Sequence, residues 1–116
     1  MIALFPKLLI GVGLLAASHH GWAEYDTERA FTLEGTIGKV DYINPHVLIR
    51  VRPADDSTRT WLAVLAPPSR MTRRGLPADS VRVGEMARLY GYPHKEIPDE
   101  MRAERITFGT RTTELR

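Results

Sequence analysis

The stretch from Phe31 to Tyr42 constrains the fold more than any other part of the chain. Its apolar residues alternate with polar ones, as in a strand with one buried face, but the alternation changes parity between Gly35 and Gly38. Glycine inside a strand marks a bulge or a sharp bend, which lets one strand curl around a small barrel. We therefore expect a long, bent first strand.

Four more strands are predicted after this one. Asn44-Pro45 indicates a turn, because proline fixes φ and asparagine hydrogen-bonds to its own following backbone. Alternating or continuous apolar runs between turn residues then indicate strands over residues 47–52, 60–65, 86–92 and 101–108. Gly109 allows a short terminal strand beyond them.

One short helix is predicted between the third and fourth strands. Pro67-Pro68 ends the third strand, Ser69 is the expected N-cap, and Gly75 closes the helical turns. A sandwich has about seven strands and a doubly wound fold has several long helices, so this order fits neither. The expected fold class is all-β with one short helix, in an OB-like five-stranded barrel.

The N-terminus has the pattern of a cleavable export signal. Lys7 precedes an apolar run that ends at Ala17, and small residues follow. The run is shorter than the roughly 20 residues of a membrane-spanning helix. We expect a periplasmic or secreted protein with no stable membrane insertion after cleavage. Its predicted parts are a signal peptide (1–18), an N-terminal arm (19–30) and a single barrel domain (31–116).

Composition argues against several classes of function. Removal of residues 1–18 takes away one basic residue, leaving 15 lysines and arginines against 14 acids. So small an excess gives no electrostatic basis for binding nucleic acid. The chain has no cysteine, which excludes disulfides and thiolate chemistry. No nucleophile motif, phosphate-binding loop or zinc-protease helix occurs, so we expect no enzyme activity.

Several short motifs follow one another in a specific order. They are His19-His20, Trp22-Ala23-x-Tyr25-Asp26, Leu33-x-Gly35-Thr36, Asn44-Pro45-His46, Trp61, Arg73-Arg74-Gly75 and Gly91-x-Pro93. Together they resemble a family of small exported bacterial proteins, domain of unknown function 6152. The chain departs from that pattern at Gly21, where a serine is usual, and at Leu76, where a tryptophan is usual. The resemblance implies export and a β-rich fold, and it brings no established activity.

The candidate metal ligands are the four histidines, His19, His20, His46 and His94. In an OB-like barrel, His46 lies in the loop between the first two strands and His94 in the loop between the last two, and these loops flank the usual binding face. Cleavage before His19 lets its α-amine and imidazole chelate one ion. Imidazole and amine nitrogens suit Cu(II), Ni(II) or Zn(II), and copper is favoured by the Irving–Williams order.

The position of cleavage decides whether this site can form. A cut before Ser18 places a histidine third from a free amine, which is itself a square-planar chelate. A cut after Ala23 removes both leading histidines. The structural alternative is that His46 and His94 cap turns through Nδ1 and bind no ion.

Two functions follow from these residues. The leading hypothesis is an exported, non-catalytic barrel that binds a transition-metal ion, with copper favoured, through the four histidines. The alternative is a binding or scaffold module whose barrel face recognises a protein, peptide or glycan without a metal.

We expect Trp61 in the core and Trp22 pinning the N-terminal arm. The arginines at 50, 52, 70, 73, 74, 88, 102 and 105 are interleaved with acids, which favours a solvated surface over an anion-binding face.

Overall fold

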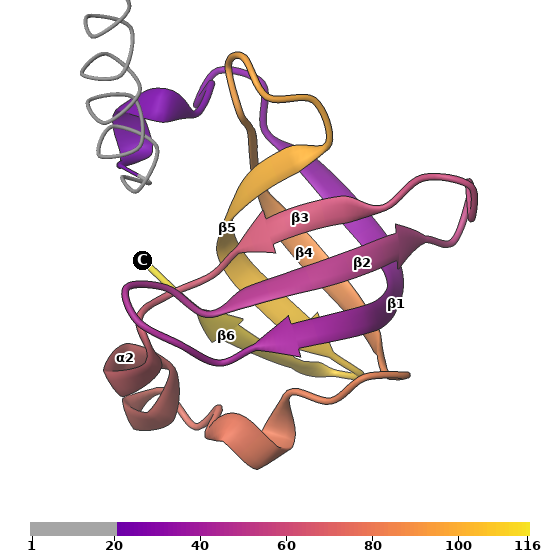
Figure 1. The fold of residues 1–116 in the computed structure, drawn as a ribbon. Coiled ribbons are helices and arrows are strands. Elements are labelled where there is room, and N and C mark those ends of the chain that lie inside the picture. The colour runs from indigo at the N-terminus through magenta and orange to yellow at the C-terminus, as the bar shows by residue number, and fades with distance from the viewer. Residues whose placement is uncertain (1–20) are drawn as a thin grey trace, which may run out of the picture.

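A closed barrel of five strands forms the body of the chain (Figure 1). The computed structural model describes residues 21–116, so the expected signal peptide, His19 and His20 lie outside the described residues. The strands are β1 (Phe31–Asp41), β2 (Leu48–Pro53), β3 (Trp61–Val64), β4 (Met86–Pro93), β5 (Glu100–Phe108) and β6 (Arg111–Glu114). The helical elements are α2 (Pro68–Arg73) and the 3-10 turns η2 (Trp22–Glu24) and η3 (Ala78–Ser80).

Pairing between β3 and β5 closes the barrel. The sheet order is β3-β2-β1-β4-β5-β6, and β3 also runs parallel to β5, with Leu62 opposite Glu100. Three strands, a helix and two strands therefore form an OB-type barrel, which confirms the predicted fold class. β6 extends the sheet beyond β5, and α2 lies at the opposite end of the barrel from the β4–β5 loop (Figure 1).

β1 bends as predicted and so serves both halves of the barrel. Its first half pairs with β4, its second half pairs with β2, and the register shifts at Gly38, between Ile37 and Lys39. The expected change of parity is therefore confirmed. At Gly35 the two strands approach so closely that a Cβ would overlap the backbone carbonyl of Arg52.

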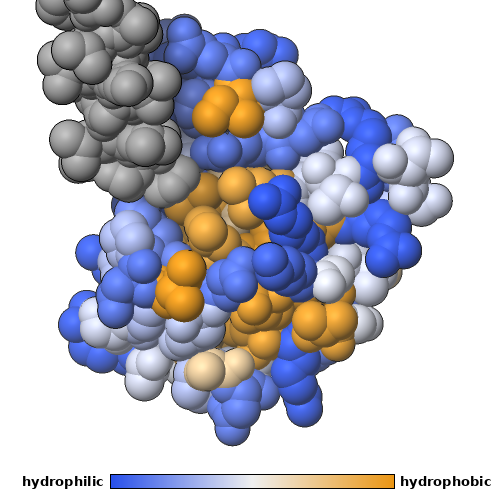
Figure 2. Space-filling model, in the orientation of Figure 1, coloured by the Kyte–Doolittle hydropathy of each residue, from blue (hydrophilic) through white to orange (hydrophobic). Residues whose placement is uncertain are grey.

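The core is built from the inward side chains of the strands. Ile37, Ile49, Leu89 and Ile106 are completely buried, and α2 adds Met71. Burying each such side chain contributes about 1.5–3 kcal/mol, which suits a chain without disulfides. Apolar surface also shows over β2 and β3 (Figure 2).

The helix begins earlier than predicted. Pro67 is the N-cap and Pro68 the first helical residue, whereas Ser69 lies inside the helix. The expectation that Ser69 caps α2 is wrong, because proline at the first position loses no hydrogen bond and its φ already suits the turn. Gly75 follows the helix with a φ of 93°, as its closing role requires. Within residues 21–116, no helix is long and apolar enough to cross a membrane.

Candidate ligand-binding site

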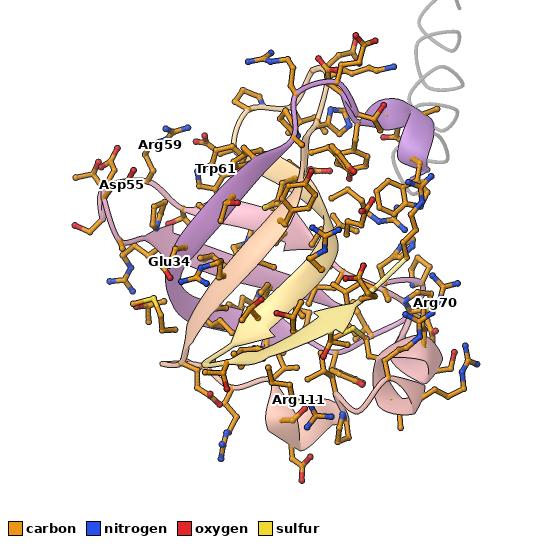
Figure 3. The ribbon with its side chains drawn as sticks, turned by 180° about the vertical axis from the view of Figure 1, so that it is seen from behind. Glu34, Asp55, Arg59, Trp61, Arg70 and Arg111 are labelled. Carbon is orange, nitrogen blue, oxygen red and sulfur yellow. The ribbon has the colours of Figure 1, made fainter. Side chains whose placement is uncertain are left out.

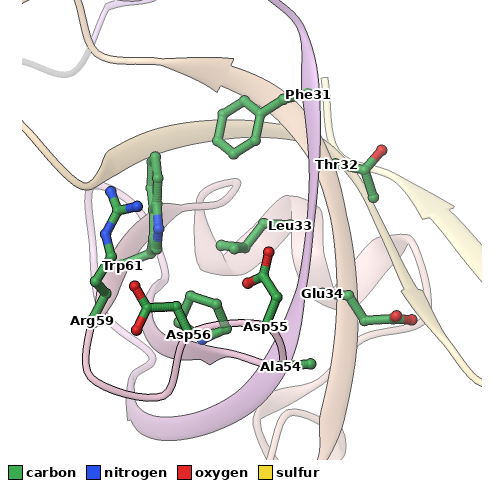
Figure 4. A pocket seen from close by; sticks show the side chains of 10 residues that line it. Phe31, Thr32, Leu33, Glu34, Ala54, Asp55, Asp56, Arg59 and Trp61 are labelled. Carbon is green, nitrogen blue, oxygen red and sulfur yellow. The ribbon is translucent and has the colours of Figure 1, made fainter.

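A pocket of about 560 Å³ opens between the start of β1 and the start of β3 (Figure 4). We call it the β1–β3 pocket. The residues that line it are Phe31, Thr32, Leu33, Glu34, Pro53, Ala54, Asp55, Asp56, Arg59 and Trp61. They come from two segments, the first four residues of β1 and the stretch that runs from the end of β2 through the loop to the start of β3.

The pocket exists because the start of β1 extends beyond the end of β2, its antiparallel neighbour. Pairing of β1 with β4 starts at Phe31, but pairing with β2 starts only at Gly35, opposite Pro53. Proline cannot donate to a strand ladder, so the pairing stops there. The chain then turns away after Ala54, whose N–H donates to the carbonyl of Glu34 at 2.9 Å. The first residues of β1 are left facing β3 across a gap.

Two aromatic side chains in contact with each other line this gap. The ring centroids of Phe31 and Trp61 are 5.1 Å apart, with their planes at 47°. Figure 4 shows the indole turned toward the side of the pocket that Phe31 and Leu33 line. The guanidinium of Arg59 lies 5.4 Å from the indole centroid. Trp61 packs on the core as expected, but it is only half-buried and lines the pocket.

The rim of the pocket is mainly acidic. Glu34 pairs with Arg88 at 3.0 Å, and Arg59 pairs with Asp99. The Asp55 carboxylate makes no hydrogen bond or ion pair with any residue of 21–116. Asp55, Arg59 and Glu34 are seen from behind the barrel in Figure 3.

Two ionisable groups on this rim are held in their charged forms. Hydrogen bonds from the hydroxyl and then the backbone N–H of Thr58 lower the pKa of Asp56. The hydrogen bond and charge of Asp99 raise the pKa of Arg59. The carboxylates of Asp55 and Asp56 and the guanidinium of Arg59 lie at the hollow, whereas the Glu34 side chain points away from it and pairs with Arg88. The hollow is therefore left with excess negative charge.

The structure gives His94 a role inside the β4–β5 loop. Its Nδ1 accepts the backbone N–H groups of Glu96 at 3.0 Å and Ile97 at 2.9 Å, and its Nε2 lies 3.1 Å from Glu24 Oε1. With two donors at Nδ1, the ring proton sits on Nε2 and donates to Glu24. A metal ion on Nε2 would require that proton on Nδ1, where both N–H groups already point. This geometry favours the turn-capping alternative for His94.

The backbone next to His46 and the backbone of His94 are attached to different parts of the β3 region. Val47, the residue after His46, donates its N–H to the carbonyl of Ala66, just beyond the end of β3. The N–H of His94 donates to the carbonyl of Glu100, which pairs with Leu62 in β3. The two histidines are therefore attached at different points along β3, and their joint ligation of one ion stays a prediction.

The predicted four-histidine metal site depends on residues beyond this structure. His19 and His20 lie outside the described residues. Among residues 21–116, no three histidine or acidic side chains gather as a metal ion would need. The metal site stays a prediction, and it now depends on the N-terminal pair.

A second aromatic cluster holds η2 against β5. We call Trp22, Tyr25, His94, Glu100 and Arg102 the Trp22–Tyr25 cluster. Tyr25 is 1% exposed, donates its hydroxyl to Glu100 Oε2 at 2.7 Å and meets the His94 ring edge-on at 5.1 Å. Burial, followed by the hydrogen bond to Glu100, raises the pKa of Tyr25. The guanidinium of Arg102 lies 4.3 Å from the Trp22 centroid, so the arm is pinned where Trp22 was expected to pin it.

Several of the arginines make contacts within the fold. Arg70 donates to the carbonyl of Leu115 at 3.2 Å, and Arg74 to that of Glu114 at 2.6 Å. These two residues of the α2 region therefore hold the end of the chain. Arg105 pairs with Glu114 at 3.0 Å. The expected alternative of an anion-binding arginine face is not supported by these contacts.

Sequence reasoning missed the pocket residues. The sequence alone gives Asp55 and Asp56 the pattern of a polar turn and Phe31 that of an ordinary strand residue. The available signal was an acidic pair closely preceding a strand tryptophan, Trp61. That signal is weak, because only the unequal lengths of β1 and β2 turn these residues toward one another.

These features define a small OB-type barrel with a ligand-sized pocket in its wall. The chain belongs to the family of unknown function DUF6152, whose model matches residues 8–100. The resemblance drawn from its short motifs is thus confirmed. No curated protein matches the chain.

Two solved structures share the fold. One is the complex of TiaS with tRNA(Ile2) and ATP, with 19% identity, a TM-score of 0.52 and coverage of 79% of this chain. The other is apo TiaS, a tRNAIle2 agmatidine synthetase, with 18% identity, a TM-score of 0.52 and coverage of 81%. The match covers 20% of each TiaS chain, so this chain spans about a fifth of their length. At this identity the likeness shows the fold alone.

Proposed function

We propose that this protein is an exported, non-catalytic binding module that takes a cationic ligand with an apolar body into the β1–β3 pocket. One observation carries the proposal: Phe31 and Trp61 pack together along a hollow whose rim bears the Asp55 carboxylate, and that carboxylate has no hydrogen-bond or ion-pair partner among residues 21–116. Aromatic faces attract alkylammonium and guanidinium groups, and a nearby carboxylate adds to that attraction.

The fixed charges of the pocket support binding rather than catalysis. Thr58 lowers the pKa of Asp56, and Asp99 raises the pKa of Arg59. Both shifts lead away from neutrality, whereas a general acid or base works best with a pKa near the working pH. These two groups therefore keep their charge and attract or orient a ligand without exchanging protons with it.

The same charges argue against a nucleic acid ligand. Barrels that bind single strands use positive grooves and stacking aromatics, because phosphates dominate the affinity. This pocket has the aromatics but carries the carboxylates of Asp55 and Asp56, and its arginine is paired with Asp99. The tRNA and ATP in the TiaS complex are therefore poor guides to the ligand proposed for this chain.

Tryptophan fluorescence tests the proposal. The chain has two tryptophans, so the Trp22→Phe variant reports on Trp61 alone. Titration with benzyltrimethylammonium should change its emission saturably, and benzenesulfonate, the anion of similar shape, should not. Asp55→Asn should weaken the response, whereas the matched control Asp79→Asn, on η3, should leave it unchanged. Equal responses to cation and anion, or no saturation, would contradict the proposal.

Copper binding by His19 and His20 is a separate proposal for the N-terminal arm. The observation in its favour is that two adjacent histidines lie next to predicted cleavage positions, where a free amine adds a third nitrogen ligand. Equilibrium dialysis of the processed protein against Cu(II) should show binding that His19→Ala abolishes and His94→Ala preserves. No binding tighter than millimolar, or equal loss in both variants, would exclude it.

A further inference from the structure

The start of β1 has one paired edge and one open edge. Residues 31–34 pair with β4 on one side, and on the other side pairing with β2 begins only at Gly35, opposite Pro53. An unpaired strand edge offers N–H and C=O groups in the spacing that another strand requires. Here that edge forms one wall of the β1–β3 pocket.

The backbone of Thr32 points to the open edge. In an antiparallel strand, alternate residues direct both backbone groups to the same side. Glu34 accepts from Ala54 on the β2 side, whereas Ile37 accepts from Gly84 on the β4 side. Thr32 shares the parity of Glu34, so its N–H and C=O face the pocket. No strand among residues 21–116 pairs with Thr32 on that side.

The surroundings of this edge favour alternating apolar and basic contacts. Phe31 and Leu33 have the inward parity, so a side chain opposite them would lie against their aromatic and aliphatic groups and Trp61. Side chains two residues away on the same face of that segment would lie toward Asp55 and the ionised Asp56. The charge of the rim thus complements lysine or arginine.

We infer that the β1–β3 pocket binds an extended peptide segment with an apolar residue flanked by basic ones, which adds as a strand to β1 at Thr32. The inference rests on the proposed function and names its ligand class. A paired N–H and C=O on one residue matches the main chain of a peptide, which supplies affinity in strand addition while the pocket selects side chains. A small free amine would use the aromatic walls and leave the Thr32 groups unused.

A peptide and its N-methylated form separate these cases. The probe is acetyl-Lys-Val-Phe-Val-Lys-amide, and the control carries N-methyl groups on both valines, whose amides would face β1. The unmodified peptide should bind at least about tenfold more tightly, because main-chain hydrogen bonds are lost in the control. In NMR spectra, the Thr32 amide should shift and become protected from hydrogen exchange only with the unmodified peptide.

Variants at Thr32 test the same contact from the protein side. Thr32→Pro removes the outward N–H and should weaken peptide binding about tenfold, whereas Thr32→Val keeps the N–H and should not. Equal affinities for the two peptides would overturn strand addition. If benzyltrimethylammonium still binds in that case, the proposed function stands and only this inference fails. If neither the cation nor either peptide binds, both fail.

Discussion

Two aromatic regions of this barrel differ in what they leave unused. In the Trp22–Tyr25 cluster, the hydroxyl of Tyr25 is bound to Glu100 and both ring nitrogens of His94 are engaged within the chain. In the β1–β3 pocket, the carboxylate of Asp55 and the backbone of Thr32 face a hollow. The first region carries the residue types that suggest chemistry, yet they stabilise the fold. Groups left without partners, rather than residue type, mark the candidate site.

The difference has a simple structural origin. η2 packs on β5 and closes the first region, with Tyr25 bridging to His94 and the Glu24 carbonyl accepting from Lys95. No segment of residues 21–116 covers the edge of β1 where β2 stops at Pro53. A site arises where neighbouring strands differ in length.

Replacing His94 should produce the largest effect on stability. His94→Ala removes three hydrogen bonds and an edge-on ring contact with buried Tyr25, a loss of about 2–4 kcal/mol in the free energy of unfolding. Urea denaturation measures this loss. Binding of benzyltrimethylammonium to the folded protein should not change.

Two conservative variants separate the contributions of the two ring nitrogens to that loss of stability. His94→Asn places an oxygen where Nδ1 was and keeps the turn bonds, whereas His94→Gln reaches Glu24 but abandons the turn. Each should recover part of the stability. If His94→Ala left stability intact while abolishing ligand or Cu(II) binding, the contrast between the two regions would be reversed.

Trp61→Ala should have the next largest effect, on binding. Removing one aromatic wall of the pocket should cost about 2 kcal/mol of ligand affinity, or about 30-fold, as for a central aromatic contact. Trp61→Phe keeps an aromatic face and should cost less. Isothermal titration calorimetry with the peptide probe measures both, and unchanged affinity in Trp61→Ala would remove the pocket as the site.

Alkaline pH should lower the free energy of unfolding through the Trp22–Tyr25 cluster. Burial and Glu100 raise the pKa of Tyr25, so the folded protein keeps the phenolic proton at a pH where the unfolded chain has lost it. The stabilisation is complete below about pH 10 and falls above it by about 1.4 kcal/mol per pH unit. Urea midpoints between pH 9 and 12 measure this slope.

Tyr25→Phe should reduce that slope by the contribution of one proton. Tyr90→Phe is the matched control, because the Tyr90 hydroxyl has no hydrogen-bond partner among residues 21–116. If the native protein and both variants had the same slope, Tyr25 would not be a buried, protonated residue of the folded state.

Asp99→Asn should have the smallest effect. It removes the partner of Arg59, so the pocket gains an uncompensated positive charge, and affinity for benzyltrimethylammonium should fall about two- to threefold. Asparagine tolerates the φ of 58° at this position, so the backbone should be kept. The same titration at higher salt should show a smaller difference, and an increase in affinity would contradict the charge argument.

The strands were predictable because their signals are local. The alternation around Gly35 and Gly38 specified both the strand and its bulge, and that pattern exists before any tertiary contact forms. The N-cap of α2 was not predictable in this way, because Pro67, Pro68 and Ser69 all fit a helix start. The choice among them depends on the direction in which the chain leaves β3. Local chemistry narrows such a boundary to a few residues.

The candidate site was much less predictable. Histidine attracts attention because its ring can ligate, cap or titrate, but the choice depends on which groups approach its two nitrogens. For His94 those groups are two N–H donors of its own loop and a carboxylate from η2, 70 residues earlier. Conversely, Phe31 and Asp55 have no distinctive sequence context until pairing brings them to one hollow.

The sequence by itself determined the order of strands and the bend in β1, because periodicity, glycine and proline act through the backbone of a few neighbouring residues. The order of its short motifs likewise indicated the DUF6152 family. Only the tertiary structure decided which polar groups are satisfied. Whether Asp55 or His94 has a partner depends on segments that are distant in the chain, and the open edge at Thr32 depends on where β2 ends opposite β1. A ligand site is what remains after those long-range pairings are made.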